Sequence, residues 1–166
     1  MRLRKPATMA LAVGLAFLGL SLPTTSAQAA TVCDTKFDDY QNRGFNHVHA
    51  WSEPNCGGTW LGDAAQGTAD WNWGDSAGDF TGSDDNNAES VMNTASSSSV
   101  VAFYRLAGDP AGTWDDGYVC LKGSELYVDG LARNNFENRR DLSVDNRISA
   151  HQWVTPSACT DYSYIS

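Results

Sequence analysis

Two clusters of carboxylate, amide and hydroxyl side chains lie 60 residues apart in this sequence. The first is Asp85-Asn86-Asn87-Ala88-Glu89-Ser90, and the second is Asp145-Asn146-Arg147-Ile148-Ser149-Ala150. Side-chain and carbonyl oxygens of this kind are the ligands that calcium takes in proteins, at about 2.3–2.6 Å. Asp and Asn are also typical of turns, because their side chains bond to their own backbone. The clusters therefore indicate either a cation site or a pair of turns.

Two further pairs could do chemistry if their segments are extended, because alternate side chains of a strand share one face. His47 and His49 could bind zinc, but no third ligand is evident nearby, so we expect exposed strand histidines. His151 is expected to pack or cap beside the second cluster. Trp71 and Trp73 could form a sugar-stacking platform, which makes a polysaccharide-binding module one possible function. We favour core packing for both, and a core position for the other four tryptophans, Trp51, Trp60, Trp114 and Trp153.

Signatures of catalysis are missing from the sequence. It contains no H-E-x-x-H zinc motif and no EF-hand loop. The letters G-x-S-x-G occur at Gly74-Asp75-Ser76-Ala77-Gly78, but no predicted strand leads into them and no helical pattern follows, so they do not make the strand–turn–helix of a nucleophile turn. Carboxylates are plentiful, but no pattern singles out a pair of them for glycoside hydrolysis. We therefore expect a protein that is not an enzyme.

The elements that would position these residues are short strands. Runs rich in β-branched and aromatic residues recur between clusters of Gly, Asn, Asp and Ser, whereas helical periodicity is nearly absent after residue 30. This pattern predicts an all-β sandwich or barrel. Residues 96–99, four serines, are expected to form a turn between two halves of one domain. The predicted strands are 48–51, 59–61, 90–94, 100–105, 118–121, 126–128 and 148–154.

The two halves of the chain resemble each other. In each half a strand leads to a Gly-containing bend and the half ends at one of the two Asp/Asn clusters. Such self-similarity predicts a tandem duplication. We place motif one at about residues 45–95 and motif two at about residues 99–154.

The bend in the first half carries a resemblance to the βγ-crystallin-like proteins. That family's bend is an aromatic, four residues, an aromatic, one residue and a glycine, and here Trp51, Cys56 and Gly58 occupy those positions, with Cys56 in place of the second aromatic. In the second half the corresponding glycine, Gly112, comes later in the sequence than the family's spacing requires. The sequence is similar to secreted bacterial members grouped with the peptidase inhibitor family that includes a Streptomyces metalloproteinase inhibitor. The resemblance implies a two-sheet sandwich of two Greek-key motifs.

The resemblance also implies calcium as a cofactor. The family's calcium signature is two Asn/Asp, two variable residues, Ser/Thr and Ser, and paired motifs exchange ligands. Both clusters depart from this signature. Glu89 replaces a hydroxyl residue in the first, and Ala150 replaces the last serine in the second. Arg147 also places a cation beside the second cluster. Carried over by position, the metal residues are Asp85, Asn86, Asn87 through its carbonyl, Glu89, Asp145, Asn146, Arg147 through its carbonyl, and Ser149.

The N-terminal residues have the features of a secretory signal peptide. A basic start is followed by an apolar run from Met9 to Leu22 and by the small-x-small sequence Ala27-Gln28-Ala29. The run is shorter than the roughly 20 residues that a membrane span needs. We assign residues 1–29 to the signal peptide and residues 30–166 to a single domain, and we expect the protein to be secreted and extracellular.

The exported part is strongly acidic. Removal of three basic residues with the signal leaves eight basic and 20 acidic residues, a net charge of −12. Such a surface repels phosphate, so nucleic acid and membranes are not expected partners. We expect a monomer.

All four cysteines, Cys33, Cys56, Cys120 and Cys159, lie in the exported part. An even number in an oxidising compartment predicts two disulfides. Three pairings are possible, and we favour Cys33–Cys56 with Cys120–Cys159 because each pair would then hold one half of the chain.

The resemblance makes inhibition of an extracellular peptidase the first functional hypothesis, with a secreted protease as the partner. Residues 70–85 form the longest candidate binding loop. The alternatives are a calcium-binding structural protein of the envelope or extracellular space, and the polysaccharide-binding module on Trp71 and Trp73.

Overall fold

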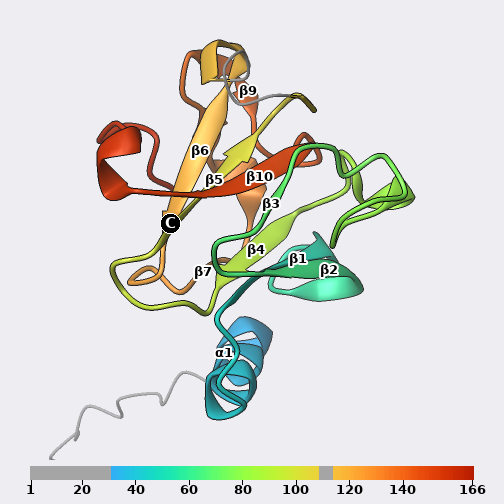
Figure 1. The fold of residues 1–166 in the computed structure, drawn as a ribbon, viewed down its shortest axis with the longest axis vertical. Coiled ribbons are helices and arrows are strands. Elements are labelled where there is room, and N and C mark those ends of the chain that lie inside the picture. Colours follow the sequence, from blue (N-terminus) through green and yellow to red (C-terminus); the bar gives the residue numbers. More distant parts are fainter. Residues whose placement is uncertain (1–30, 109–113) are drawn as a thin grey trace, which may run out of the picture.

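The computed structural model describes residues 31–108 and 114–166, and the predicted signal peptide lies outside them (Figure 1). In the described ranges, no helix is long and apolar enough to cross a membrane. The elements of these ranges are one α-helix, ten strands and four short 3-10 helices. In chain order they are α1 Val32–Asn42, β1 His47–Glu53, β2 Gly57–Ala65, β3 Ala69–Asp70, η1 Gly82–Asp84, β4 Ser90–Asn93, β5 Val100–Tyr104, η2 Trp114–Asp116, β6 Tyr118–Lys122, β7 Tyr127–Val128, η3 Leu131–Arg133, β8 Asn135–Phe136, β9 Arg139–Ser143, β10 Ala150–Val154 and η4 Pro156–Ala158.

The main strands form two antiparallel sheets that exchange one strand each. The first sheet has the order β2-β1-β4-β7 and the second has the order β3-β10-β5-β6. Strand β3 comes from the first half of the chain but pairs with β10, and β7 comes from the second half but pairs with β4. The two halves thus have the same plan, with the third strand of each placed in the other's sheet. The predicted all-β sandwich of two Greek-key motifs is confirmed.

The core lies between the two sheets. Strand β1 turns Val48 and Ala50 into it, and β5 turns Val101 and Phe103 toward them from the other sheet. This alternation is what period-two strands require, and it buries all four side chains completely. Every strand predicted from the sequence is present, within a few residues of its expected limits.

Helix α1 was not predicted. Thr31 caps its first turn, accepting from the backbone N–H of Asp34, while the Asp34 carboxylate accepts from the backbone N–H of Thr31. Cys33, Phe37 and Tyr40 are spaced for one helical face and pack against the first sheet. The helix, blue at the foot of Figure 1, covers the face of that sheet that points away from the core.

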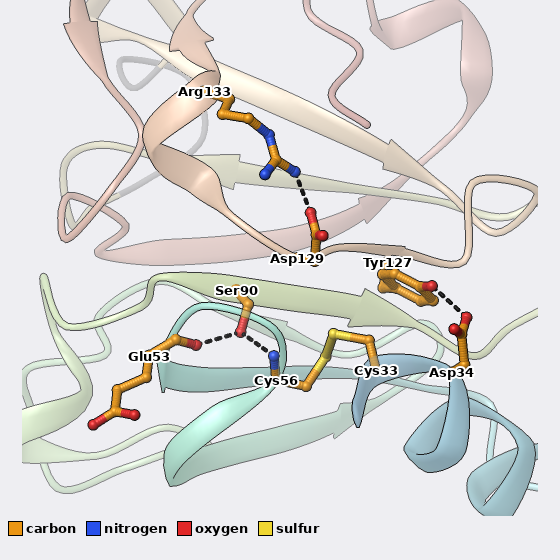
Figure 2. A network of polar contacts seen from close by, with 8 residues as sticks. All are labelled: Cys33, Asp34, Glu53, Cys56, Ser90, Tyr127, Asp129 and Arg133. Atoms are coloured by element: carbon orange, nitrogen blue, oxygen red, sulfur yellow. Dashed lines mark hydrogen bonds and ion pairs between the residues drawn. A yellow bond between two sulfur atoms is a disulfide. The ribbon is translucent and has the colours of Figure 1, made fainter. Parts of the chain in front are cut away.

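The disulfides are Cys33–Cys56 and Cys120–Cys159, the pairing favoured from the sequence. Cys56 occupies the place of the second aromatic in the bend, and its bond to Cys33 fastens α1 there, as Figure 2 shows. The bend needs a glycine at its end, because Gly58 has a φ of 65° and a Cβ there would lie 2.7 Å from Ser52 Oγ.

Strands β3, β8 and β9 were also missed. Strands β3 and β8 have two residues each, too few to show a period. Strand β9, Arg-Arg-Asp-Leu-Ser, is largely polar, and among the described residues it pairs with β8 alone. The β8–β9 hairpin has no counterpart in the first half of the chain and is an addition to the duplicated plan.

Candidate functional site

The two Asp/Asn clusters lie against each other. The backbone N–H of Asn86 donates to the carbonyl of Ile148 at 2.9 Å, and that of Asn146 donates to the carbonyl of Ala88, also at 2.9 Å. Donors and acceptors both differ by 60 positions, so the contacts are related by a local twofold. Asn86 and Asn146 have matching left-handed backbones, with φ values of 54° and 53°. The duplication seen in the sequence thus produces one symmetric loop pair.

The side chains repeat this exchange. Asn146 donates from Nδ2 to Glu89 Oε1 at 3.0 Å, and Ser149 donates from Oγ to Asn86 Oδ1 at 3.4 Å. Glu89 and Ser149 are equivalent positions of the two clusters. Each therefore contacts the asparagine of the opposite cluster, as expected for motifs that exchange ligands. The replacement of a hydroxyl residue by Glu89 lengthens the side chain without breaking the exchange.

The loop pair has more acceptors than its own donors satisfy. Asp85 accepts from Asn86 Nδ2 at 2.7 Å through Oδ2, but its Oδ1 is buried with no hydrogen-bond partner. Burial, and then the charge of Glu89, raises the pKa of Asp145, although Arg147 and the bond from Asn146 act in the opposite direction. The charge of the Asp145 carboxylate is therefore not fully compensated, and Asp85 Oδ1 lacks a donor.

Arg147 does not fill this gap. It is exposed, and its Nη1 lies 3.3 Å from the carbonyl oxygen of Ser143 and 3.5 Å from that of Asp145. Both contacts are to the backbone of its own loop. The guanidinium thus folds back over the second cluster, and it makes no described ion pair with a carboxylate of the pair.

The donor chemistry of the loop pair suits a hard cation. Carboxylate, amide, hydroxyl and carbonyl oxygens are the ligands of calcium, and an unpartnered buried carboxylate oxygen is what such an ion would satisfy. Asp85 and Asn86, with Glu89, are the candidates from the first loop. Asp145 and Asn146, with Ser149, are those from the second. Over the ranges that the structure describes, no group of three or more His, Cys, Asp or Glu side chains is placed to hold a metal, so any site must use amide, hydroxyl and backbone oxygens as well.

The tryptophan pair does not form a sugar platform. Trp73 is completely buried and stacks on Phe80 with the ring centroids 4.0 Å apart, while Trp71 is half-buried against Tyr104. The hypothesis of a polysaccharide site on Trp71 and Trp73 is wrong, because the loop uses both rings as anchors. The expectation for Trp60 is wrong in the opposite sense, since 52% of it is exposed on β2.

The histidines also differ from expectation. His49 is buried under α1, whereas an exposed strand histidine was predicted. Burial first, and then the charge of His47, lowers the pKa of His49 to about 3. His151 packs beside the second cluster as expected, accepting at Nδ1 from Trp73 Nε1 over 3.0 Å. Its burial lowers its pKa to about 3 as well.

The loop of residues 70–85 is held rigidly at its base. Asp70 accepts from the backbone N–H of Asn72 at 3.0 Å and from that of Phe80 at 3.2 Å. The Trp73–Phe80 stack fixes the same segment to the core. Residues 74–79, between these anchors, are all exposed. Asp70 was not singled out from the sequence, although an Asp before a Gly-rich loop is a typical signal for such a clamp.

Comparisons with known proteins add little to this picture. No protein-family model matches the sequence, and the search of curated proteins gives no match. A solved structure from work on the evolution of the eye lens βγ-crystallin domain fold is similar to this chain. The identity is 15%, the TM-score is 0.41, and the match covers 67% of this chain and 87% of that chain. The paired-motif architecture itself is carried by the strand order and the exchange of β3 and β7 between the sheets.

Proposed function

We propose that this protein is an exported, non-catalytic structural domain whose paired loops bind calcium. The observation that carries the proposal is the symmetric contact of the two clusters together with the unpartnered buried oxygen of Asp85. The two disulfides favour an oxidising, extracellular compartment, where calcium is abundant. A modest affinity is sufficient for occupancy there, because extracellular modules bind calcium with dissociation constants of roughly 10⁻⁴–10⁻³ M.

Calcium would act on this domain through stability. The ion relieves repulsion between Asp145 and Glu89 only when the two loops are together, so it binds the folded state in preference to the unfolded chain. Such preferential binding adds about 2.7 kcal/mol at a calcium concentration 100 times the dissociation constant. The two halves of the domain are then held by the ion as well as by the core.

The test is thermal unfolding of the oxidised protein in millimolar calcium, in magnesium and in a chelator. We expect calcium alone to raise the midpoint. Asp85→Asn should lose the calcium-dependent rise, and Asp38→Asn, an exposed acid on α1, should retain it. No rise in the parent protein would show that the loops are simply turns, and an equal rise in Asp85→Asn would show that calcium binds elsewhere than at Asp85.

Asp145→Asn gives a sharper result, because its two effects have opposite signs. The raised pKa of Asp145 shows that its negative charge is unfavourable in the folded state without a cation. A neutral amide of the same shape should therefore stabilise the chelator-treated protein and, at the same time, abolish the response to calcium. A purely structural role for Asp145 would not produce both effects, a higher stability in chelator and the loss of the response to calcium.

A second candidate is inhibition of a secreted peptidase through the tip at residues 74–79. The observation that favours it is the clamped base of this loop, since a preorganised loop loses little entropy when it enters a cleft. Titration of secreted metalloproteases and serine proteases with the oxidised protein should then give stoichiometric loss of activity. Replacing residues 75–77 should abolish inhibition, and steady cleavage of the loop without inhibition would refute this candidate.

A further inference from the structure

The open edge of β6 is covered by two segments that meet over a pocket. From the β8–β9 hairpin, the backbone N–H of Glu137 donates to the carbonyl of Tyr118 at 2.9 Å. From the C-terminal tail, Ile165 donates to the carbonyl of Cys120 at 3.0 Å, and Cys120 donates to Ser163 at 2.8 Å. Both walls of the pocket are therefore fastened to the same strand.

The tail is further fixed at both of its ends. The Cys120–Cys159 disulfide ties its start to β6, and Ile165 is buried in the main core. Tyr162 and Tyr164 lie between these two anchors. Their backbone is thus held in place, which lowers the entropic cost of binding a ligand against them.

The pocket has a volume of about 280 Å³. This is close to the lower end of the roughly 300–1,000 Å³ typical of small-molecule sites, so it suits a ligand the size of one sugar ring. Its lining is mostly polar, with two tyrosines. The lining includes Arg133, Asn134, Asn135, Glu137, Arg140 and Tyr162.

The charges of this pocket are fixed and balanced. Arg140 donates from Nη2 to Glu137 Oε2 at 3.1 Å, and its guanidinium lies 4.9 Å from the centre of the Tyr162 ring. Arg133 is paired with Asp129, the ion pair that Figure 2 shows. Because each arginine has an acidic partner, the pocket offers oriented donors and acceptors without a surplus of positive charge.

Two features of the lining bear on ligand binding. Asn134 has a buried side-chain nitrogen with no hydrogen-bond partner. Tyr162 is 76% exposed, so its ring is accessible to a ligand. An asparagine amide without a partner and an accessible ring beside one pocket suit a ligand that has polar groups and an apolar face.

We propose that this pocket binds one unit of a neutral saccharide. A sugar ring carries hydroxyls that both donate and accept, which matches the arginine, asparagine and carboxylate groups of the lining, and its C–H face matches the exposed ring of Tyr162. An anionic glycan is disfavoured, because the local arginines are already paired and the exported chain has a net charge of −12.

This saccharide site is separate from the paired loops and does not depend on calcium. It also differs from the tryptophan platform that was expected on residues 71–73, since it uses a tyrosine on the C-terminal tail. No sequence pattern indicated this pocket, because the hairpin and the tail are far apart in the chain and meet through their common attachment to β6.

The test is titration of the oxidised full protein with soluble pentasaccharides of glucose, xylose and N-acetylglucosamine, with binding monitored by NMR or calorimetry. Polygalacturonate is the charged comparison. We expect saturable binding of at least one neutral glycan, unchanged by chelator, with signals of the tail and the hairpin shifted. Tyr162→Ala and Arg140→Gln should each weaken it by about tenfold or more.

Matched controls come from the same molecule. Arg139→Gln removes a neighbouring arginine that does not line the pocket, and Trp60→Ala removes an exposed aromatic ring on the other sheet. Both should bind as the parent does. The proposal is overturned if no neutral glycan binds at millimolar concentration, if polygalacturonate binds more tightly, or if the controls lose as much affinity as the pocket variants.

Discussion

The imidazole of His49 stacks on the ring of Tyr40, with the ring centroids 4.3 Å apart and the planes 7° from parallel. Tyr40 belongs to α1 and His49 to the face of β1 that points away from the core. The stack therefore marks the place where the helix seals the outer side of the first sheet. It also explains why His49, only 2% exposed, has a pKa of about 3.

This depressed pKa predicts a loss of stability in acid. The unfolded chain takes up a proton on His49 near pH 6.5, whereas the folded protein does so only near pH 3. Stability from the neutral imidazole is therefore complete above about pH 6.5 and declines as the pH falls toward 3. His49→Phe keeps an aromatic ring against Tyr40 but removes the titration. We expect its free energy of unfolding to fall less than that of the parent between about pH 7 and about pH 4.5.

The measurement is urea denaturation at both pH values for the parent and the variant. His151, with the same direction of shift, remains in both proteins, so the acid sensitivity should shrink without disappearing. If the free energy of unfolding falls equally in the two proteins, protonation of His49 does not destabilise the folded state, and the prediction is wrong.

The regular part of the fold could be predicted because its signals are local. Strands β1 and β5 alternate between core and outer face, and the two Asp/Asn clusters repeat at a fixed distance. The resemblance to the βγ-crystallin-like proteins implied that the paired motifs meet, and Asn86 and Asn146 each donate to the backbone of the opposite cluster. The strand exchange and the loop pair both follow from this duplication.

What could not be predicted depends on contacts between distant segments. Cys33, Phe37 and Tyr40 are spaced for a helix, but these three positions in 11 residues, most of them polar, are too few to make the pattern stand out. Without the helix, His49 had to be expected on an exposed face. The sequence also left open whether Trp73 packs in the core or forms a sugar-binding platform. Its partner Phe80 follows an acidic, Gly-rich loop, and nothing in that loop predicts that it returns to the core.

A second prediction concerns the hydrogen bond that Tyr127 of β7 donates to Asp34 of α1, which Figure 2 shows. This bond is the largest cause of the lowered pKa of Asp34, and the bonds from Thr31 contribute less. Tyr127→Phe should therefore raise the pKa of Asp34 toward its ordinary range, while the capping bonds keep part of the depression. Carboxyl carbon chemical shifts followed against pH measure this directly.

The sign of the matching stability effect is fixed by the same shift. A carboxyl with a lowered folded pKa contributes stability above its unfolded value, near pH 3.9, and loses that contribution as the pH falls. The cost of Tyr127→Phe should thus be larger near neutral pH than in strong acid. Tyr162→Phe, which alters a tyrosine remote from α1, should leave the Asp34 titration unchanged, and a shift there would point to a general effect of losing a hydroxyl.

The third prediction concerns Ser90, the residue that joins the first bend to β4. Its hydroxyl accepts from the backbone N–H of Cys56 at 3.1 Å and donates to the carbonyl of Glu53 at 2.7 Å, and the residue is completely buried (Figure 2). Both partners belong to the bend, in which Asn55 and Cys56 have left-handed backbones. Ser90→Ala leaves both groups without this bond inside the protein and should lower the free energy of unfolding by about 1–3 kcal/mol.

Ser76→Ala, at an exposed position in the loop of residues 70–85, is the matched control and should change stability by less than about 0.5 kcal/mol. Denaturant unfolding of the two oxidised variants separates the outcomes. A loss for Ser90→Ala as small as that of the control would mean that water enters the bend and replaces the hydroxyl. A loss in the expected range would show that Ser90 fixes the bend, because the Cys33–Cys56 disulfide is intact in both variants and cannot account for the difference.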